Sequence, residues 1–257
     1  MLLPLQRGIL YGPVHSRRYG RSLGINLMPS QYKLCSFNCV YCHYGWTKTC
    51  TMEMARHVAD MPLLREVLQE VEQALRSQSE FELLTFSGNG EPTLYPEFAE
   101  LVDAVVQLRD QHRPFVSVAL LSNATGLADP KVRERIPKLD LPVFKLDCGT
   151  EKAFRTMNRP AQTVRFDGIV ESLAGIKGIY LQTVMIDGTP SNTEYADLQS
   201  YIEKVGRIRP KEVHLYSIDR PTPETRISLV PPDRLQQIAA QVQSQTGIRV
   251  KTFAARR

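Results

Sequence analysis

The chain has 257 residues, of which 42% are hydrophobic and 23% charged, and a formal net charge of +5 at neutral pH. This length suffices for one sizeable domain with its own core. No apolar run is long enough to span a bilayer, and residues 1–7 lack the charged start and long apolar stretch of a signal peptide. We therefore expect a cytoplasmic protein without membrane contact. The mild basic excess permits an anionic partner without indicating one.

The chain opens with residues 1–21, which we expect to form an irregular lead-in. Three basic residues, Arg17, Arg18 and Arg21, lie within five positions there. They predict either a solvated basic turn, which the sequence favours, or a clamp for a carboxylate or phosphate, because arginine forks match such groups. Residues 23–27 alternate apolar with small or polar residues, which predicts a first strand.

Strands and helices then alternate along the chain. Asp60 is expected to cap the first helix, with Pro62 in its first turn. Apolar residues at helical spacing predict further helices near residues 98–106, 166–173 and 195–205, and Asp129 with Pro130 opens a short one. Further strands are expected at residues 82–87, 116–121, 142–147, 179–186 and 212–217, and a helix from about residue 232 and a strand at 248–253 follow.

This alternation, repeated at least six times with short links, indicates parallel βαβ units with right-handed crossovers. Six such units build either an open doubly wound sheet or an incomplete barrel. The pattern alone does not choose between these two α/β architectures.

A cluster of cysteines follows the first predicted strand. Cys35, Cys39 and Cys42 are spaced Cys-x3-Cys-x2-Cys. Iron–sulfur clusters take thiolate ligands, commonly four, so three cysteines would leave one iron open to a small ligand. A structural zinc site is the alternative, with Cys50 or His43 as a fourth ligand. Five cysteines in a chain this long do not make a disulfide framework.

Polar groups also gather where the other predicted strands end. In α/β barrels these carboxyl ends form the active site. Each group has a plainer explanation as a turn, a cap or a satisfied interior polar residue, and it is their coincidence that indicates a site. The candidates are Gly88, Asn89, Gly90, Glu91, Ser122, Asn123, Asp147, Gln182 and residues 216–220.

The cysteine run, with Tyr41 before its third cysteine, resembles the signature of the radical SAM superfamily. Six further motifs extend the likeness over nearly the whole chain, and together they resemble a group related to the wyosine-base-forming enzymes that modify tRNA. These motifs are Gly12-Pro-Val-His-Ser-Arg-Arg, Ser22-Leu-Gly-Ile-Asn-Leu, Phe86-Ser-Gly-Asn-Gly-Glu-Pro, Phe144-Lys-Leu-Asp-Cys-Gly, Asn158-Arg-Pro and Tyr216-Ser-Ile-Asp-Arg-Pro.

The resemblance implies a fold and a set of cofactors. The fold is a partial (βα)6 TIM-like barrel of the radical SAM type, formed by one domain over residues 1–257. Residues 22–220 would be its core, and residues 221–257 would add a helix and a strand. The cofactors are a 4Fe–4S cluster, held by Cys35, Cys39 and Cys42, and S-adenosylmethionine.

The resemblance also implies residues that hold S-adenosylmethionine. The turn Gly88-Asn89-Gly90-Glu91 is similar to the glycine-glycine-glutamate motif that binds the methionine amino group, with Asn89 in place of the second glycine and Gly90 added. By the same likeness, Tyr41 would contact adenine. Ribose and carboxylate contacts would come from Ser122, Asn123, Asp147 and Gln182.

The implied activity is reductive cleavage of S-adenosylmethionine at the cluster, which yields a 5′-deoxyadenosyl radical that abstracts hydrogen from an unidentified substrate. Such an oxidoreductase or lyase-type enzyme needs an electron donor such as flavodoxin or ferredoxin. One alternative is a wyosine-type synthase acting on tRNA. Those enzymes carry a second cluster, whereas only Cys50 and Cys148 remain here, so we expect one cluster. The other alternative is a non-catalytic metal-binding protein.

Overall fold

The computed structural model describes residues 2–253. Met1 and residues 254–257, at the two ends of the predicted domain range, lie outside the described residues. The large sheet has the strand order β1-β2-β5-β6-β7-β8-β9-β11, with β10 paired to β8. Its centre consists of neighbouring parallel strands, β2 (Gly20–Ile25), β5 (Leu83–Phe86), β6 (Ser117–Ser122), β7 (Leu141–Lys145), β8 (Tyr180–Gly188) and β9 (Glu212–Ser217).

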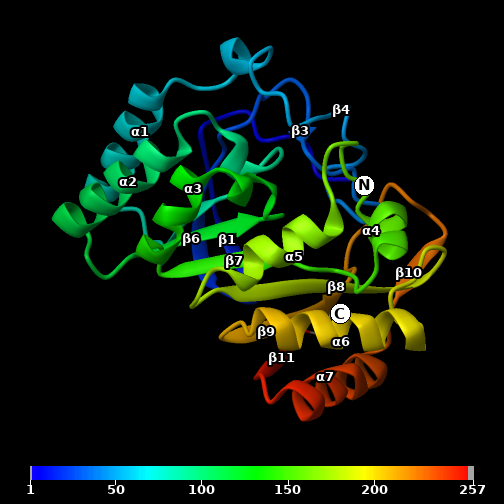
Figure 1. Cartoon of the computed structure of the whole chain (residues 1–257). Coiled ribbons are helices and arrows are strands. Elements are labelled where there is room, and N and C mark those ends of the chain that lie inside the picture. Colours follow the sequence, from blue (N-terminus) through cyan, green and yellow to red (C-terminus); the bar gives the residue numbers. More distant parts are fainter. Residues whose placement is uncertain (1, 254–257) are drawn as a thin grey trace.

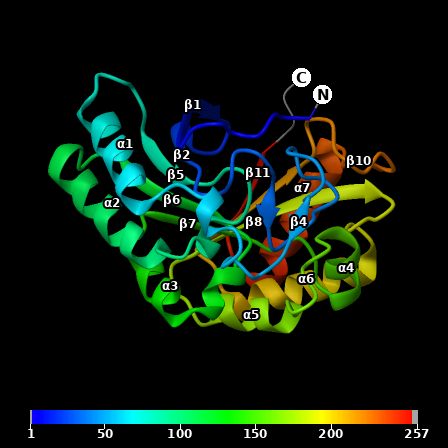
Figure 2. The same cartoon turned by 90° about the horizontal axis from the view of Figure 1, so that it is seen from above.

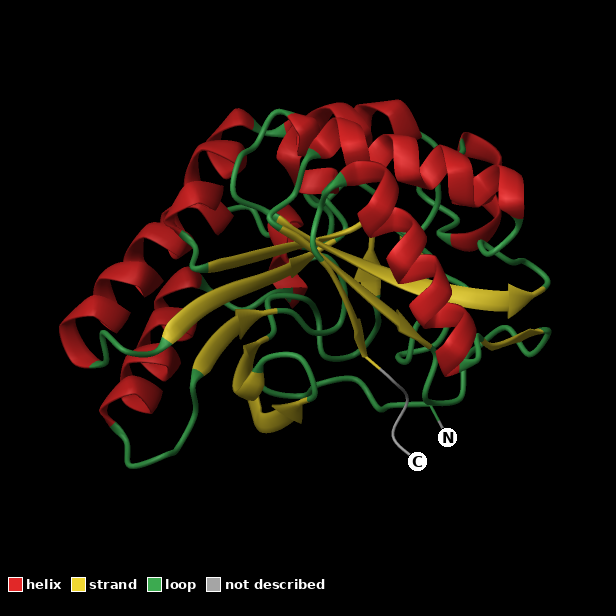
Figure 3. Ribbon diagram, turned by 90° about the horizontal axis from the view of Figure 1, so that it is seen from below, coloured by secondary structure: helices red, strands yellow, loops and turns green. Residues whose placement is uncertain are grey.

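Helices connect these strands and form an outer arc along one side of the curved sheet (Figure 1 and Figure 3). The first of them buries Val67, Val71 and Leu75 at a spacing of four residues, which is the apolar stripe expected of a helix packed on a sheet. The helices are α1 (Leu64–Arg76), α2 (Phe98–His112), α3 (Pro130–Arg135), α4 (Glu151–Met157), α5 (Phe166–Ala174), α6 (Tyr195–Ile208) and α7 (Pro232–Thr246).

The strand order decides between the two architectures that the alternation left open. From β2 to β9 the neighbours follow chain order without reversal. A doubly wound sheet reverses its order at a switch point, whereas a barrel does not. The fold is therefore the expected partial barrel. The carboxyl ends of its parallel strands share one edge, and the segment carrying β3 (Leu34–Cys35) and β4 (Thr49–Cys50) lies across that edge (Figure 1 and Figure 2).

Two predicted helix details need correction. Asp60 does not cap α1, because it ends a 3-10 turn (Val58–Asp60) and accepts a hydrogen bond from the Tyr32 hydroxyl. The helix begins after Leu63, whose N–H donates to the Glu66 carboxylate. The sequence analysis also missed α4, whose seven residues are too few for a periodic pattern and whose start is capped by Thr150 Oγ1.

The predicted irregular lead-in is also wrong, because it contains the strand β1 (Leu10–Ser16), antiparallel to β2. Four of its seven residues are exposed and none is fully buried, so the sequence shows no alternation of apolar and polar residues there. Ser16 Oγ accepts hydrogen bonds from the N–H groups of Arg18 and Tyr19, which folds the turn between the two strands. Two further strands complete the sheet, β10 (Ile227–Leu229) and β11 (Val250–Phe253). The second of them lies within residues 248–253, where the sequence predicted a strand.

The turn between β1 and β2 reaches across to the last strands of the barrel. The Tyr19 hydroxyl lies 2.9 Å from His214 Nδ1 on β9, and Arg17 pairs with Asp219 at 2.5 Å. His214 Nε2 lies 2.6 Å from Glu212 Oε1. A carboxylate only accepts, so Nε2 carries the ring proton and Nδ1 accepts from Tyr19. Burial lowers the pKa of His214, which favours the neutral ring over the charged one. Side chains of this turn thus link the first barrel strand to the last.

We predict that Tyr19→Phe lowers the free energy of unfolding by about 1–3 kcal/mol, because it leaves buried His214 Nδ1 without a donor. Urea denaturation of the metal-free protein measures this change. Tyr195→Phe is the matched control, since Tyr195 is 77% exposed, and it should change stability by less than about 0.5 kcal/mol. Equal effects of the two substitutions would contradict the cross-barrel role of Tyr19.

Candidate functional site

The cysteine loop, residues 33–48, which includes β3 and ends before β4, is held by backbone contacts with the end of α4. Asn38 N–H donates to the carbonyl of Asn158, and Val40 N–H donates to that of Met157, each at 2.9 Å. Within the loop, Lys33 Nζ donates to the Gly45 carbonyl at 2.8 Å. These contacts fix a segment that has almost no regular secondary structure of its own.

Two of the three sulfurs accept hydrogen bonds from amide N–H groups. Cys35 Sγ accepts from Phe37 N at 3.5 Å and from Asn123 Nδ2 at 3.7 Å. Cys39 Sγ accepts from Asn158 Nδ2 at 3.5 Å. Burial raises the pKa of both thiols. Lys33 lies near the run as well: burial alone would lower its pKa, but the thiolates of Cys42, Cys35 and Cys39 raise it on balance.

This donor set fits an iron–sulfur cluster. A bound metal centre deprotonates thiols and so removes the proton that burial favours. N–H groups directed at thiolates then stabilise the negative sulfurs. Among the described residues, no three His, Cys, Asp or Glu side chains lie close enough to hold one metal ion.

The turn after β5 packs directly on the start of the cysteine loop. Gly90 pairs with Leu34 in a parallel bridge, and a Cβ on Gly90 would lie 1.6 Å from the Leu34 carbonyl oxygen. Gly88 has φ +132, a region that L side chains rarely adopt. Glycine at position 90 thus lets the predicted ligand-binding turn touch the residue before Cys35, and glycine at position 88 permits the backbone conformation of that turn.

The side chains of this turn are directed into the protein. Glu91 is buried, and its carboxylate accepts from Thr93 N, Thr93 Oγ1, Ser122 Oγ and Asn123 N at 2.5–3.1 Å. Asn89 bonds the backbone of Gln6 and Pro29 through its side-chain amide. What this turn offers a ligand is therefore its backbone rather than these two side chains.

The predicted pair after β6 joins this turn to the cysteine loop. Ser122 Oγ donates to Glu91 Oε1 at 2.7 Å and accepts from Ala124 N. Asn123 donates from Nδ2 to Ser36 Oγ at 2.9 Å as well as to Cys35 Sγ. The structure thus brings together the two predicted groups Gly88–Glu91 and Ser122–Asn123 beside the first cysteine.

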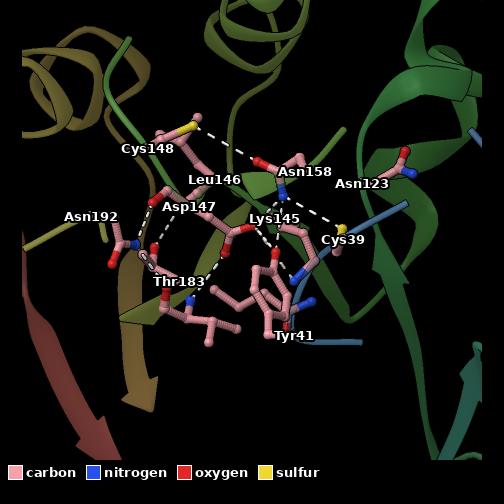
Figure 4. Close-up of polar contacts among 12 residues, drawn as sticks. Cys39, Tyr41, Asn123, Lys145, Leu146, Asp147, Cys148, Asn158, Thr183 and Asn192 are labelled. Carbon is pink, nitrogen blue, oxygen red and sulfur yellow. Dashed lines mark hydrogen bonds and ion pairs between the residues drawn. The ribbon is translucent and has the colours of Figure 1, made fainter. Parts of the chain in front are cut away.

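Asp147 is the centre of a second buried network (Figure 4). Its Oδ2 accepts from the Tyr41 hydroxyl and, at 2.8 Å, from Asn158 Nδ2, and its Oδ1 accepts from Val184 N at 3.0 Å. Lys145 Nζ lies 3.8 Å from the same carboxylate and 5.0 Å from the Tyr41 ring centroid. Burial raises the pKa of the Tyr41 phenol well above its usual value, with Asp147 adding to the effect.

Sequence reasoning did not assign Asn158 to the site, although it touches Cys39, Tyr41 and Asp147. Its only signal was the motif Asn158-Arg-Pro, which gave a resemblance but no role. Gln182, by contrast, lies where it was expected, in the barrel strand β8. Its Oε1 accepts from Arg18 at 2.7 Å, a partner on the β1–β2 turn that the sequence did not indicate.

The two remaining cysteines lie near the end of α4. Cys50 is paired in register with Cys35, and its Sγ lies 3.7 Å from the Arg159 carbonyl oxygen. Cys148 is buried, with its Sγ 3.7 Å from Asn158 Oδ1. Neither is disulfide-bonded.

A family model described as the radical SAM superfamily matches residues 31–205, which include the cysteine loop, the glycine turn and both networks. The chain belongs to the radical SAM superfamily. Membership implies a 4Fe–4S cluster and S-adenosylmethionine in general terms, and it makes the protein an enzyme whose reaction is not specified by the match. No described helix is long and apolar enough to cross a membrane.

Curated relatives match most of this radical SAM chain. It is 32% identical over 222 residues to a UPF0026 protein of Helicobacter pylori, which covers 83% of this chain and 67% of that protein. It is 31% identical to a UPF0026 protein of Synechocystis, covering 84% and 78%. It is 30% identical over 218 residues to a Brachyspira hyodysenteriae protein named GTPase Obg, but spans only 30% of it.

Solved structures with the same fold are more distant in sequence. A radical SAM methyltransferase from Sphaerobacter thermophilus gives a TM-score of 0.62 at 13% identity, covering 92% of this chain and 67% of that one. TYW1 with a lysine-pyruvate adduct bound gives 0.57 at 17% identity, covering 88% and 75%. At these identities the likeness concerns the radical SAM fold alone.

We predict that Gly90→Ala lowers cluster loading in this radical SAM protein, because the new Cβ would displace Leu34 and with it Cys35. Iron content after anaerobic reconstitution measures the effect. Gly168→Ala on α5 is the control, since a Cβ there meets nothing within 4 Å. Full iron loading of a folded Gly90→Ala variant would show that the contact between turn and loop is dispensable.

Proposed function

We propose that this protein cleaves S-adenosylmethionine reductively to a 5′-deoxyadenosyl radical, which abstracts hydrogen from a substrate held in the barrel. The observation that carries the proposal is the contact between Gly90 and Leu34. It joins a glycine turn suited to a small ligand to a loop with three cysteines, at the edge where parallel strands end.

Cys35, Cys39 and Cys42 would hold the 4Fe–4S cluster. When bound, the cluster supplies the electron that S-adenosylmethionine cleavage requires, and it leaves one iron without a protein thiolate. The amides of Asn123 and Asn158 already face the sulfurs of Cys35 and Cys39. Hydrogen bonds to cluster sulfurs tune the reduction potential, so these two asparagines would be tuning residues.

The remaining predicted residues would surround S-adenosylmethionine in two ways. The turn Gly88-Asn89-Gly90-Glu91 would accept the methionine ammonium through backbone carbonyls, while the side chains of Asn89 and Glu91 hold the turn in place. Ser122 and Asn123 would hold this turn against the cysteine loop. The adenosine part of the cofactor would contact Tyr41, Asp147 and Gln182, with Asp147 acting mainly as an anchor for Tyr41.

Superfamily membership also supports the need for a reductant. We propose a one-electron carrier such as flavodoxin or ferredoxin, met in the cytoplasm. The cysteine loop gives such a partner access, because Cys42 is only partly buried and Trp46 in the same loop is 41% exposed.

Substitution of Cys35, Cys39 or Cys42 by Ala should abolish both the cluster absorbance and the formation of 5′-deoxyadenosine with dithionite and S-adenosylmethionine. Cys148→Ala and Cys50→Ala are the matched controls and should retain both. Anaerobic reconstitution followed by mass spectrometry of the nucleoside product measures the outcome. A triple-Ala variant that still cleaves S-adenosylmethionine would refute the proposal.

A tRNA-modifying wyosine-type synthase is the second candidate, favoured by the shared fold with TYW1. A second 4Fe–4S cluster would need about three further thiolates, and only Cys50 and Cys148 remain. We therefore predict about four irons per chain. A count near twice that value, or conversion of methylguanosine in tRNA with pyruvate to a tricyclic base, would favour the synthase.

A further inference from the structure

Cys50 is a fourth cysteine beside the cysteine loop, and the proposed function leaves it without a role. It lies outside the three-cysteine run, yet it is paired with the first cysteine of that run, Cys35, in the parallel ladder of β3 and β4. Within residues 2–253 this is the one pair of cysteines matched between strands, since the other three lie outside strands. Both thiols are free.

Two backbone hydrogen bonds hold this pair in register. Thr49 N–H donates to the Lys33 carbonyl at 3.3 Å, and Thr51 N–H donates to the Cys35 carbonyl at 3.1 Å. Neighbouring strands lie about 4.8 Å apart, and residues paired across them direct their side chains to the same face. A disulfide requires Cα atoms about 4.4–6.8 Å apart. The backbone therefore already holds Cys35 and Cys50 at the spacing of a disulfide-bonded pair.

The present contacts of the two sulfurs are weak and do not oppose such a bond. Cys50 Sγ donates to the carbonyls of Ser36 and Arg159 at 3.5 and 3.7 Å, and Ser36 directly follows Cys35. Cys35 Sγ accepts two amide hydrogen bonds, also at 3.5 and 3.7 Å. Hydrogen bonds of thiol sulfur contribute little energy. Rotation of the two side chains towards each other therefore gives up little.

The two thiols differ in exposure. Cys35 is buried, with 9% of its surface accessible, whereas both residues of β4, including Cys50, are partly exposed. An oxidant in solution therefore reaches Cys50 more easily, because oxidation of thiols follows their accessibility. As a ligand of the bound cluster, Cys35 is unable to pair with Cys50. Loss of the cluster would leave two neighbouring thiols, one of them accessible.

We propose that Cys50 forms a disulfide with Cys35 when the cluster is lost and a peroxide is present. Hydrogen peroxide converts the Cys50 thiol to a sulfenic acid and releases one water. The Cys35 thiol then attacks that sulfur, the S–S bond forms, and a second water leaves. The two thiols together lose two electrons and two protons, and one peroxide becomes two waters.

This disulfide protects a cluster ligand reversibly. Sulfinic and sulfonic acids are not returned to thiols by simple reductants, so their formation at Cys35 would remove the ligand permanently. A disulfide at partly exposed Cys50 is open to thiol reductants, which restore both thiols. The inference rests on the proposed function only in taking Cys35 as a cluster ligand, and it adds a means by which that site survives oxidation.

Trypsin separates the two cysteines, which makes their cross-link recognisable. Cleavage after lysine and arginine gives peptide 34–48, with all three cysteines of the run, and peptide 49–56, with Cys50. Metal-free protein is reduced, freed of reductant, treated with hydrogen peroxide, alkylated and digested. Mass spectrometry should find the two peptides joined, whereas a disulfide within the run stays inside peptide 34–48.

Substitutions identify the partner within the run. Cys35→Ser and Cys50→Ser should abolish the joined peptides, whereas Cys39→Ser and Cys42→Ser should retain them. Cys148→Ser is the matched control, because Cys148 is a free cysteine outside the ladder, and it should cross-link as the unaltered protein does. Absence of joined peptides from the unaltered protein, or their persistence in Cys35→Ser, would overturn the proposal.

A second measurement tests the protection itself. In excess peroxide, peptide 34–48 of Cys50→Ser should carry at least about threefold more sulfinic and sulfonic acid than that of the unaltered protein, because no disulfide then intercepts the oxidation. Dithiothreitol should separate the joined peptides of the unaltered protein. Equal amounts of these acids in the two proteins would contradict the protection of Cys35.

The cross-linking assay requires neither a cluster nor S-adenosylmethionine, which keeps its outcome separate from the proposed function. Protein that cleaves S-adenosylmethionine but forms no joined peptides contradicts the disulfide alone. Protein that forms them but never cleaves S-adenosylmethionine contradicts the radical chemistry alone. Urea denaturation of each variant confirms that a lost cross-link reflects the missing thiol in a folded chain.

Discussion

Two buried carboxylates hold the amides that face the cysteine sulfurs, and the arrangement of the site depends on them. Glu91 accepts from the backbone N–H of Asn123, whose side chain donates to Cys35. Asp147 accepts from the side chain of Asn158, which also donates to Cys39. A buried carboxylate is costly unless hydrogen-bonded, and each of these has three or more protein donors. The cysteine loop is thereby tied to the barrel from two sides.

This arrangement explains how a loop without regular structure can hold three cysteines in place. The positions of the asparagine amides follow from β6 and from the end of α4, and these in turn follow from the packed sheet and helices. Gly90 adds a third constraint by bringing the turn after β5 against Leu34. The loop thus inherits its conformation from rigid elements around it, which is the condition for precise placement of a metal centre.

Most of the barrel could be predicted from the sequence because its strands are buried apolar runs and its helices carry apolar stripes. β1 could not, because a strand at the edge with exposed side chains has no such pattern. The cysteines and the residues at the strand ends were recognisable by type and spacing. Their partners were not: Asn158 and Arg18 reach the site from segments outside the parallel strands, and only tertiary packing brings them there.

The turn that carries Arg18 connects the architecture to the chemistry. A partial barrel has a gap between its first and last strands, and Tyr19, Arg17 and Arg18 cross it to reach β8 and the region of β9. Asp219, the partner of Arg17, also lies 3.8 Å from His43 Nε2, so the same contacts that link the two ends of the barrel also meet the cysteine loop.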